Sequence, residues 1–135
     1  MKPTQIVLIE DNPADVCLIK IAIKEKGISA SLTHFEDGVE AVRVLCGTAE
    51  ENALIPDAIL LDLNTPRTDG FDALAQLKQK ARLSQVPIAV LTSSRARSDK
   101  QRAALLGARY VEKPSELKDF LTSVGNAVEE MLTAH

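Results

Sequence analysis

Five side chains that can do chemistry each follow a short apolar run of the sequence. They are Glu10 and Asp11 after the first run, Asp62 after the third, Thr92 after the fourth and Lys113 after the fifth. If the runs are parallel strands, the residues that follow them meet at one edge of the sheet. Three carboxylates held close together repel each other at neutral pH unless a cation is bound or a pKa is shifted. The pattern therefore predicts a cation site at that edge.

Magnesium suits such a site, because it binds one or two carboxylates, several waters and a phosphoryl oxygen. Asp11 and Asp62 are the expected direct ligands, and Glu10 is expected to hold a metal-bound water. A protonated lysine has no lone pair to offer, so Lys113 should face a negative group from the opposite side. A phosphoryl group fits, with magnesium and Lys113 neutralising its oxygens and Thr92 donating a hydrogen bond. Because an aspartate carboxylate can itself be a nucleophile, a covalent aspartyl-phosphate is also possible chemistry.

Short apolar runs alternate with longer amphipathic stretches along the chain, and these elements must position the side chains. The runs are Ile6–Ile9, Ala30–Phe35, Ala58–Leu61, Ile88–Leu91 and the weaker Tyr110–Val111. The first, third and fourth are continuous rather than alternating, which is typical of strands buried on both faces. Five βα units in series predict an α/β, doubly wound, five-stranded parallel sheet with right-handed crossovers and helices on both faces.

The amphipathic stretches predict five helices. The first begins after Asn12, a good N-cap, with Pro13 in the first turn, and ends near Gly27. The others are expected at about 38–47, 71–81 and 98–107, the last of these capped by Ser98 or Asp99, and from Leu117 to Leu132. In the final stretch apolar residues recur at a spacing of three and four, which is the pattern of one buried helix face.

The length of 135 residues fits a single domain, residues 1–135, and the formal charge of −3 argues against a nucleic-acid-binding module. No apolar run is long enough to span a bilayer, and the N-terminus lacks the layout of a signal peptide. Cys17 and Cys46 form no metal motif with the two histidines, and their expected helices lie on opposite faces of the sheet. We therefore expect unpaired cysteines, no membrane partner and a cytoplasmic protein.

In combination, these motifs resemble the receiver domains of bacterial two-component response regulators. The matching segments are Glu10-Asp11, Leu61-Asp62-Leu63-Asn64-Thr65-Pro66 with Asp69-Gly70, Thr92-Ser93 and Lys113-Pro114. The resemblance extends from Ile6 to about Leu132. It implies a flavodoxin-like fold with strand order 2-1-3-4-5 and five helices.

The resemblance also implies a role for each site residue. Asp62 would accept a phosphoryl group from a histidine kinase, and Mg²⁺ would be bound by Asp11, Asp62 and the backbone carbonyl of Asn64, with Glu10 acting through water. Thr92 and Lys113 would contact the phosphoryl group, and Thr92 and Tyr110 would form the switch. The peptide bond between Lys113 and Pro114 would be cis.

The segment Leu8 to Asp15, with Leu18-Ile19 after it and Leu63 to Arg67 after the acceptor, resembles one subgroup of the family. These are single-domain regulators partnered with bacterial phytochrome-type sensor kinases. They are signalling proteins that assist their own phosphotransfer and dephosphorylation rather than enzymes. With no output domain, the chain would signal through a downstream protein or a homodimer contact at the surface formed by the fourth helix, fifth strand and fifth helix. Arg95 and Arg97 are either solvated or face an acidic partner.

Three other functions fit the sequence less well. A haloacid-dehalogenase-type phosphatase needs a second aspartate two residues after the nucleophile, and Asn64 occupies that position. A nucleotide or flavin carrier would place glycines and hydroxyl residues after the first strand, where Glu10, Asp11 and Asn12 stand instead. A pseudo-receiver acting only as an interaction module is disfavoured because all the acceptor-site residues are present.

Overall fold

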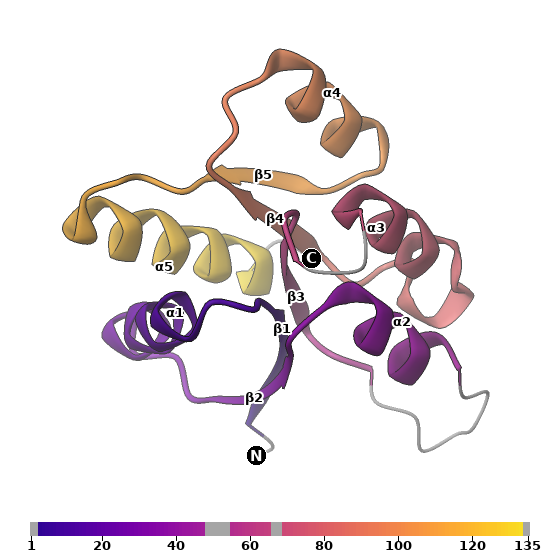
Figure 1. The fold of residues 1–135 in the computed structure, drawn as a ribbon. Coiled ribbons are helices and arrows are strands. Elements are labelled where there is room, and N and C mark those ends of the chain that lie inside the picture. Colours follow the sequence, from indigo (N-terminus) through magenta and orange to yellow (C-terminus); the bar gives the residue numbers. More distant parts are fainter. Residues whose placement is uncertain (1–2, 48–54, 66–68, 134–135) are drawn as a thin grey trace.

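Each apolar run of the sequence forms a strand of one parallel sheet (Figure 1). The strands are β1 (Thr4–Ile9), β2 (Ala30–Phe35), β3 (Ala58–Asp62), β4 (Ile88–Thr92) and β5 (Arg109–Glu112). Their order is β2-β1-β3-β4-β5, and every neighbouring pair is parallel. The computed structural model describes residues 3–47, 55–65 and 69–133, so Pro66 and Arg67 of the motif after the acceptor lie outside the described residues. The predicted doubly wound, flavodoxin-like fold is confirmed.

Helices cover both faces of this sheet. They are α1 (Pro13–Glu25), α2 (Gly38–Cys46), α3 (Gly70–Gln79), α4 (Arg97–Leu105) and α5 (Leu117–Thr133), with a short 3₁₀ turn, η1, at Ala81–Leu83. Figure 1 shows α1 beside α5 on one face, and α2 beside α3 on the other. Within the described residues, no helix is both long enough and apolar enough to cross a membrane.

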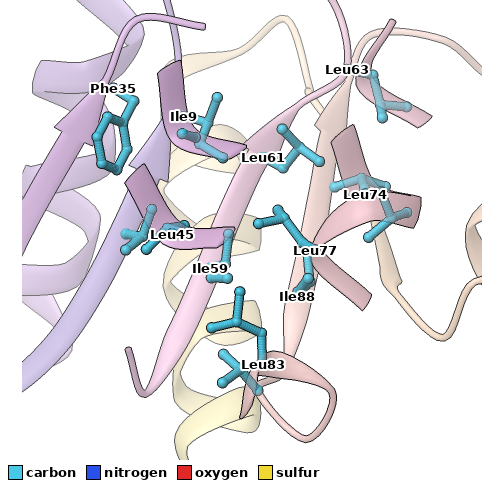
Figure 2. Packing of buried hydrophobic residues seen from close by; sticks show 14 of the residues in the cluster. Ile9, Phe35, Leu45, Ile59, Leu61, Leu63, Leu74, Leu77, Leu83 and Ile88 are labelled. Carbon is cyan, nitrogen blue, oxygen red and sulfur yellow. The ribbon is translucent and has the colours of Figure 1, made fainter. Parts of the chain in front are cut away.

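The sheet separates two hydrophobic cores because successive side chains of a buried strand point to opposite faces. On the α2 and α3 face, Ile59, Leu61 and Ile88 meet Leu45, Leu74 and Leu77 (Figure 2). On the α1 and α5 face, the alternate strand residues meet Ile19 and Val124. Both faces of β3 are fully covered, which explains why its sequence is a continuous apolar run. This packing fixes the carboxyl end of β3, where Asp62 lies.

The start of α1 follows the sequence prediction. The Asn12 side chain accepts hydrogen bonds from the backbone N–H groups of Ala14 (2.9 Å) and Asp15 (3.4 Å), and Pro13 is the first helical residue. Gly27, at φ 72°, allows the chain to leave the helix in a left-handed conformation. The cap therefore holds the first turn of α1 against the edge of the sheet.

The start of α4 differs from the prediction. The helix begins at Arg97, and its N-cap residue, Ala96, offers no side-chain hydrogen bond. The expected capping role of Ser98 or Asp99 is wrong, because the Asp99 carboxylate instead accepts a 2.7 Å hydrogen bond from the Ser94 hydroxyl. Asp99 thereby ties the helix to the loop that follows Thr92.

The two cysteines lie on α1 and α2, on opposite faces of the sheet. Both are free, as the sequence analysis predicted.

Candidate functional site

Three acids converge at the carboxyl edge of the sheet. Glu10 and Asp11 follow β1, and Asp62 is the last residue of the adjacent β3. Each offers a carboxylate oxygen within 4.8 Å of the others. Glu10 is fully buried and Asp62 is buried, whereas Asp11 is exposed to solvent. The cluster is thus open on the Asp11 side.

Lys113 neutralises this cluster from beyond β5. Its ammonium lies 2.9 Å from Glu10 Oε1, 2.9 Å from Asp15 Oδ2 and 3.1 Å from Asp62 Oδ2. All three N–H donors of the lysine therefore have carboxylate acceptors. Burial alone would lower the pKa of Lys113, but the hydrogen bonds to Asp15 and Glu10 outweigh it and raise the pKa above its ordinary value. The lysine is a permanent cation beside Asp62.

The surroundings of Glu10 and Asp62 shift the pKa values of these two carboxyl groups in opposite directions. Burial, together with the hydrogen bond to Asp62, raises the pKa of Glu10 to about 8. Burial would also raise the pKa of Asp62, but hydrogen bonds from Glu10 and from the backbone N–H of Asn64 (2.9 Å), together with Lys113, hold it below its ordinary value. The site therefore favours the ionised form of Asp62 over that of Glu10.

Thr92 brings a hydroxyl to the same edge. It is the last residue of β4 and is buried. Its Oγ1 accepts a 3.1 Å hydrogen bond from the backbone N–H of Ser94, and its carbonyl accepts a 2.7 Å hydrogen bond from the N–H of Lys113. The backbone therefore ties Thr92 directly to Lys113.

Tyr110 lies on β5, opposite Val90 of β4 in the strand register. Its half-buried ring packs against the core on the α2 and α3 face, and its hydroxyl donates a 2.6 Å hydrogen bond to the Ser94 carbonyl. The Lys100 ammonium lies 5.9 Å from the centre of the ring. Tyr110 thus contacts the loop after Thr92 rather than the acids themselves.

Two residues of the site were missed by the sequence analysis. Asp15 bonds Lys113, and its position four residues after Asp11 was the available signal, because four residues make about one helical turn. The second is His34, whose Nε2 lies 2.7 Å from the backbone carbonyl of Glu10. His34 is next to the last residue of β2, so only the order β2-β1 brings it to Glu10.

One expectation about the end of the site needs correction. The described residues contain no cis peptide bond, so the expected cis bond between Lys113 and Pro114 is wrong. The trans form of an X–Pro bond is favoured by about 0.5–1 kcal/mol. With the trans bond in place, the Lys113 ammonium contacts Glu10, Asp15 and Asp62. Arg95, expected to be solvated or to face a partner, forms a 2.7 Å ion pair with Glu112 of its own chain while remaining largely exposed.

The acidic cluster fits a hard divalent cation. Its donors are carboxylate oxygens, which Mg²⁺ and Ca²⁺ prefer over nitrogen or sulfur ligands. Its three carboxyl groups can carry three negative charges, against the single positive charge of Lys113. Asp11 is exposed, which leaves room for water ligands. Asn64 contributes its N–H to Asp62, and the role of its carbonyl stays a prediction.

An ionised aspartate beside a partly buried lysine and a hydroxyl, on this fold, defines a phosphoacceptor signalling domain. A family model described as the response regulator receiver domain matches residues 6–125. The chain belongs to the response regulator receiver family, and it is a two-component response regulator.

Individual relatives agree with this assignment. Response regulator Rcp1 from Synechocystis sp. is 37% identical over 124 residues, which cover 90% of this chain and 84% of that protein. The solved structure of the phosphorylated cyanobacterial phytochrome response regulator RcpA has a TM-score of 0.88 at 33% identity, covering 99% of this chain and 97% of that one. The Mn²⁺-bound form of Rcp1 has a TM-score of 0.87 at 35% identity, with coverages of 98% and 97%. The chain is therefore similar to single response regulators that include a phytochrome response regulator.

Proposed function

We propose that Asp62 is the residue that accepts the phosphoryl group. The observation that carries this proposal is the 3.1 Å contact between Lys113 Nζ and Asp62 Oδ2, inside a cluster where Asp62 alone is both buried and held ionised. A carboxylate oxygen of Asp62 attacks the phosphorus of a phosphohistidine on the kinase. The new O–P bond forms as the N–P bond breaks, and the electron pair of that bond returns to the histidine nitrogen.

The surrounding residues stabilise the charge that moves. Lys113 keeps its positive charge and turns one N–H from Asp62 to a phosphoryl oxygen. The Thr92 hydroxyl accepts from Ser94, which leaves its own proton to donate to a second phosphoryl oxygen. A bound divalent cation supplies further positive charge for the phosphoryl oxygens. We propose that this cation is Mg²⁺, bound by Asp11, Asp62 and the Asn64 carbonyl, with Glu10 acting through water. The same residues assist transfer to Asp62 and later hydrolysis.

The experiment that tests the acceptor is labelling by a small phosphodonor. Acetyl phosphate with magnesium should phosphorylate the wild type, and intact-protein mass spectrometry should show the added phosphoryl group. Asp62→Asn should not be labelled, because an amide oxygen is a poor nucleophile. Asp72→Asn is the matched control: Asp72 is exposed in the first turn of α3, and this variant should be labelled like the wild type. Labelling of Asp62→Asn at the wild-type rate would contradict the assignment.

We further propose a phytochrome-type histidine kinase as the phosphodonor. The support is the similarity to RcpA, which is itself a phytochrome response regulator, across nearly the whole of both chains. Phosphotransfer from such a kinase should be faster than from a kinase of unrelated sensor type under identical conditions. Equal rates for both kinases would contradict this preference and leave the acceptor assignment intact.

For output, we propose that the signal leaves through protein contact at the surface of α4, β5 and α5. A groove of about 590 Å³ lies there, lined by residues of β5 and α5 together with Arg95. Tyr110 also borders the same groove, and its hydroxyl is bonded to the loop after Thr92. Movement of the Thr92 hydroxyl toward a phosphoryl group would therefore be passed to this surface through Ser94 and Tyr110. The contact is made with a downstream protein or a second copy of the chain.

A further inference from the structure

Asp15 is the one carboxylate on Lys113 that does not belong to the acidic cluster. The ammonium bonds Glu10, Asp62 and Asp15. Glu10 and Asp62 also form the three-acid group with Asp11 that fits a divalent cation, whereas Asp15 does not. Two of the three counter-charges of Lys113 are therefore shared with the cation site.

A divalent cation at the acidic cluster would weaken the forces that hold the Lys113 ammonium in place. A divalent cation at the acids repels the ammonium, because like charges a few ångströms apart interact strongly where water is partly excluded. The same cation attracts the carboxyl groups of Glu10 and Asp62, so the contacts of both groups to Lys113 weaken. Only the Asp15 contact keeps its full strength.

A groove beside Lys113 offers its side chain a second position, outside the acidic cluster. A groove of about 370 Å³ begins at Asp15 and Lys113 and continues past Leu18 and Phe120. The side chain of Lys113 is still 14% exposed, and a lysine has a long, flexible stem. An ammonium released by the acids would be hydrated in this groove, away from Asp62.

The geometry points to Asp15 as a positioning residue, which keeps the Lys113 ammonium beside Asp62 when a divalent cation occupies the acidic cluster. Asp15 is itself well placed for this role. Its backbone N–H is bonded to the Asn12 cap, and its carboxylate lies 2.9 Å from Lys113 Nζ from the α1 side. This inference rests on the proposed function of Asp62 and extends it, because it names the residue that holds the phosphoryl-binding lysine in place.

A second role for Asp15 would have the opposite effect on anion binding. If Asp15 acted only as a nearby negative charge, its removal would strengthen the binding of an anion at Asp62. If it positions Lys113, its removal weakens anion binding, because the lysine is no longer held where the anion arrives. The sign of the change therefore separates the two roles.

The experiment uses beryllofluoride, a stand-in for the phosphoryl group, with saturating magnesium and NMR titration. We expect Asp15→Asn to weaken beryllofluoride binding about tenfold, the effect of one lost charge-assisted hydrogen bond. Asp15→Glu keeps the charge and should recover most of the affinity. Asp72→Asn makes the same charge change at the third residue of α3, as Asp15→Asn does at the third residue of α1, and should leave the affinity unchanged.

A direct readout is the ¹⁵N resonance of the Lys113 ammonium, which is observable when hydrogen bonding slows its exchange with water. In magnesium-loaded wild type and Asp72→Asn the signal should be present, and in magnesium-loaded Asp15→Asn it should be lost. Unchanged or tighter beryllofluoride binding by Asp15→Asn, or a persistent Lys113 signal in that variant, overturns the inference. If the wild type fails to bind beryllofluoride with magnesium, the proposed function fails instead.

Discussion

The hydroxyl of Tyr110 donates a 2.6 Å hydrogen bond to the backbone carbonyl of Ser94, two residues after Thr92. The N–H of Ser94 in turn bonds the Thr92 hydroxyl at 3.1 Å. Ser94 therefore bonds both the Thr92 hydroxyl, which we propose contacts the phosphoryl group, and the Tyr110 hydroxyl on β5. Thr92 and Tyr110 are therefore linked through Ser94 by two hydrogen bonds, so a movement of the Thr92 side chain can change the contact of Tyr110.

Removal of the Tyr110 hydroxyl should loosen this loop. Tyr110→Phe keeps the ring but leaves the Ser94 carbonyl without its donor, at a cost of about 1 kcal/mol. Hydrogen exchange of the Arg95 and Ala96 amides should become faster while exchange in β4 is unchanged. Arg95→Gln removes a different link of the loop, the exposed ion pair to Glu112, and should have a smaller effect. Equal protection in Tyr110→Phe and wild type would show that the hydroxyl does not hold the loop.

Beryllofluoride binding should change the NMR chemical shifts of Tyr110 and of α5. As the Thr92 hydroxyl turns toward the new anion, the Ser94 contact changes and the ring is released. We expect NMR shifts to extend from Asp62 and Thr92 through Ser94 to the Tyr110 ring and to α5. Shifts confined to Asp11, Asp62, Thr92 and Lys113 would mean that the signal leaves by another route.

Magnesium should stabilise the folded protein. The three acids are close together only in the folded state, so the cation binds that state and raises the melting temperature. At one hundred times its dissociation constant, the gain in unfolding free energy would be roughly 2.7 kcal/mol. Asp11→Asn should keep the fold and lose most of the gain. Sodium chloride at matched ionic strength is the control, and an equal shift with sodium would argue against a specific site.

Most of the fold could be predicted from the sequence because buried strands and capped helices leave local signals. The run Ala58–Leu61 predicted β3 within one residue, and Asn12 with Pro13 predicted the start of α1. The cap of α4 could not be predicted in this way, since the Asp99 side chain accepts a hydrogen bond from Ser94 of the preceding loop.

For the site, the sequence predicted which residues meet but not how they share charge. The strand order alone brings Glu10, Asp62 and Lys113 together, and this part is confirmed by the geometry. The raised pKa of Glu10 depends on its complete burial, a property of the packed fold. The contacts of Asp15 and His34 depend on where side chains point at the ends of α1 and β2. The trans bond after Lys113 is likewise a property of the folded loop.

The raised pKa of Glu10 predicts how the stability of the metal-free protein depends on pH. Its pKa is about 8 in the folded state against 4.5 for the free side chain, so folding retains a proton that the unfolded chain releases in this range. The stabilisation is complete below pH 4.5 and is lost as the pH rises to 8, by at most about 1.4 kcal/mol per pH unit. Asp62, whose pKa is lowered, loses its stabilisation only as the pH falls through the acid range, and adds no slope here.

Glu10→Gln should remove this dependence. Glutamine has the shape of the protonated glutamate, and its oxygen still accepts a hydrogen bond from Lys113. In urea unfolding with a chelator present, the wild type should lose stability between about pH 6 and about pH 8, the upper part of the range over which Glu10 titrates. Glu10→Gln should lose much less stability over the same range. Glu36→Gln, an exposed acid at the end of β2, is the matched control and should follow the wild type. Each variant differs from the wild type at a single acid, so the difference between the curves isolates Glu10. A Glu10→Gln curve parallel to that of the wild type would show that Glu10 is already ionised at neutral pH, and that Lys113 neutralises the cluster without a shared proton.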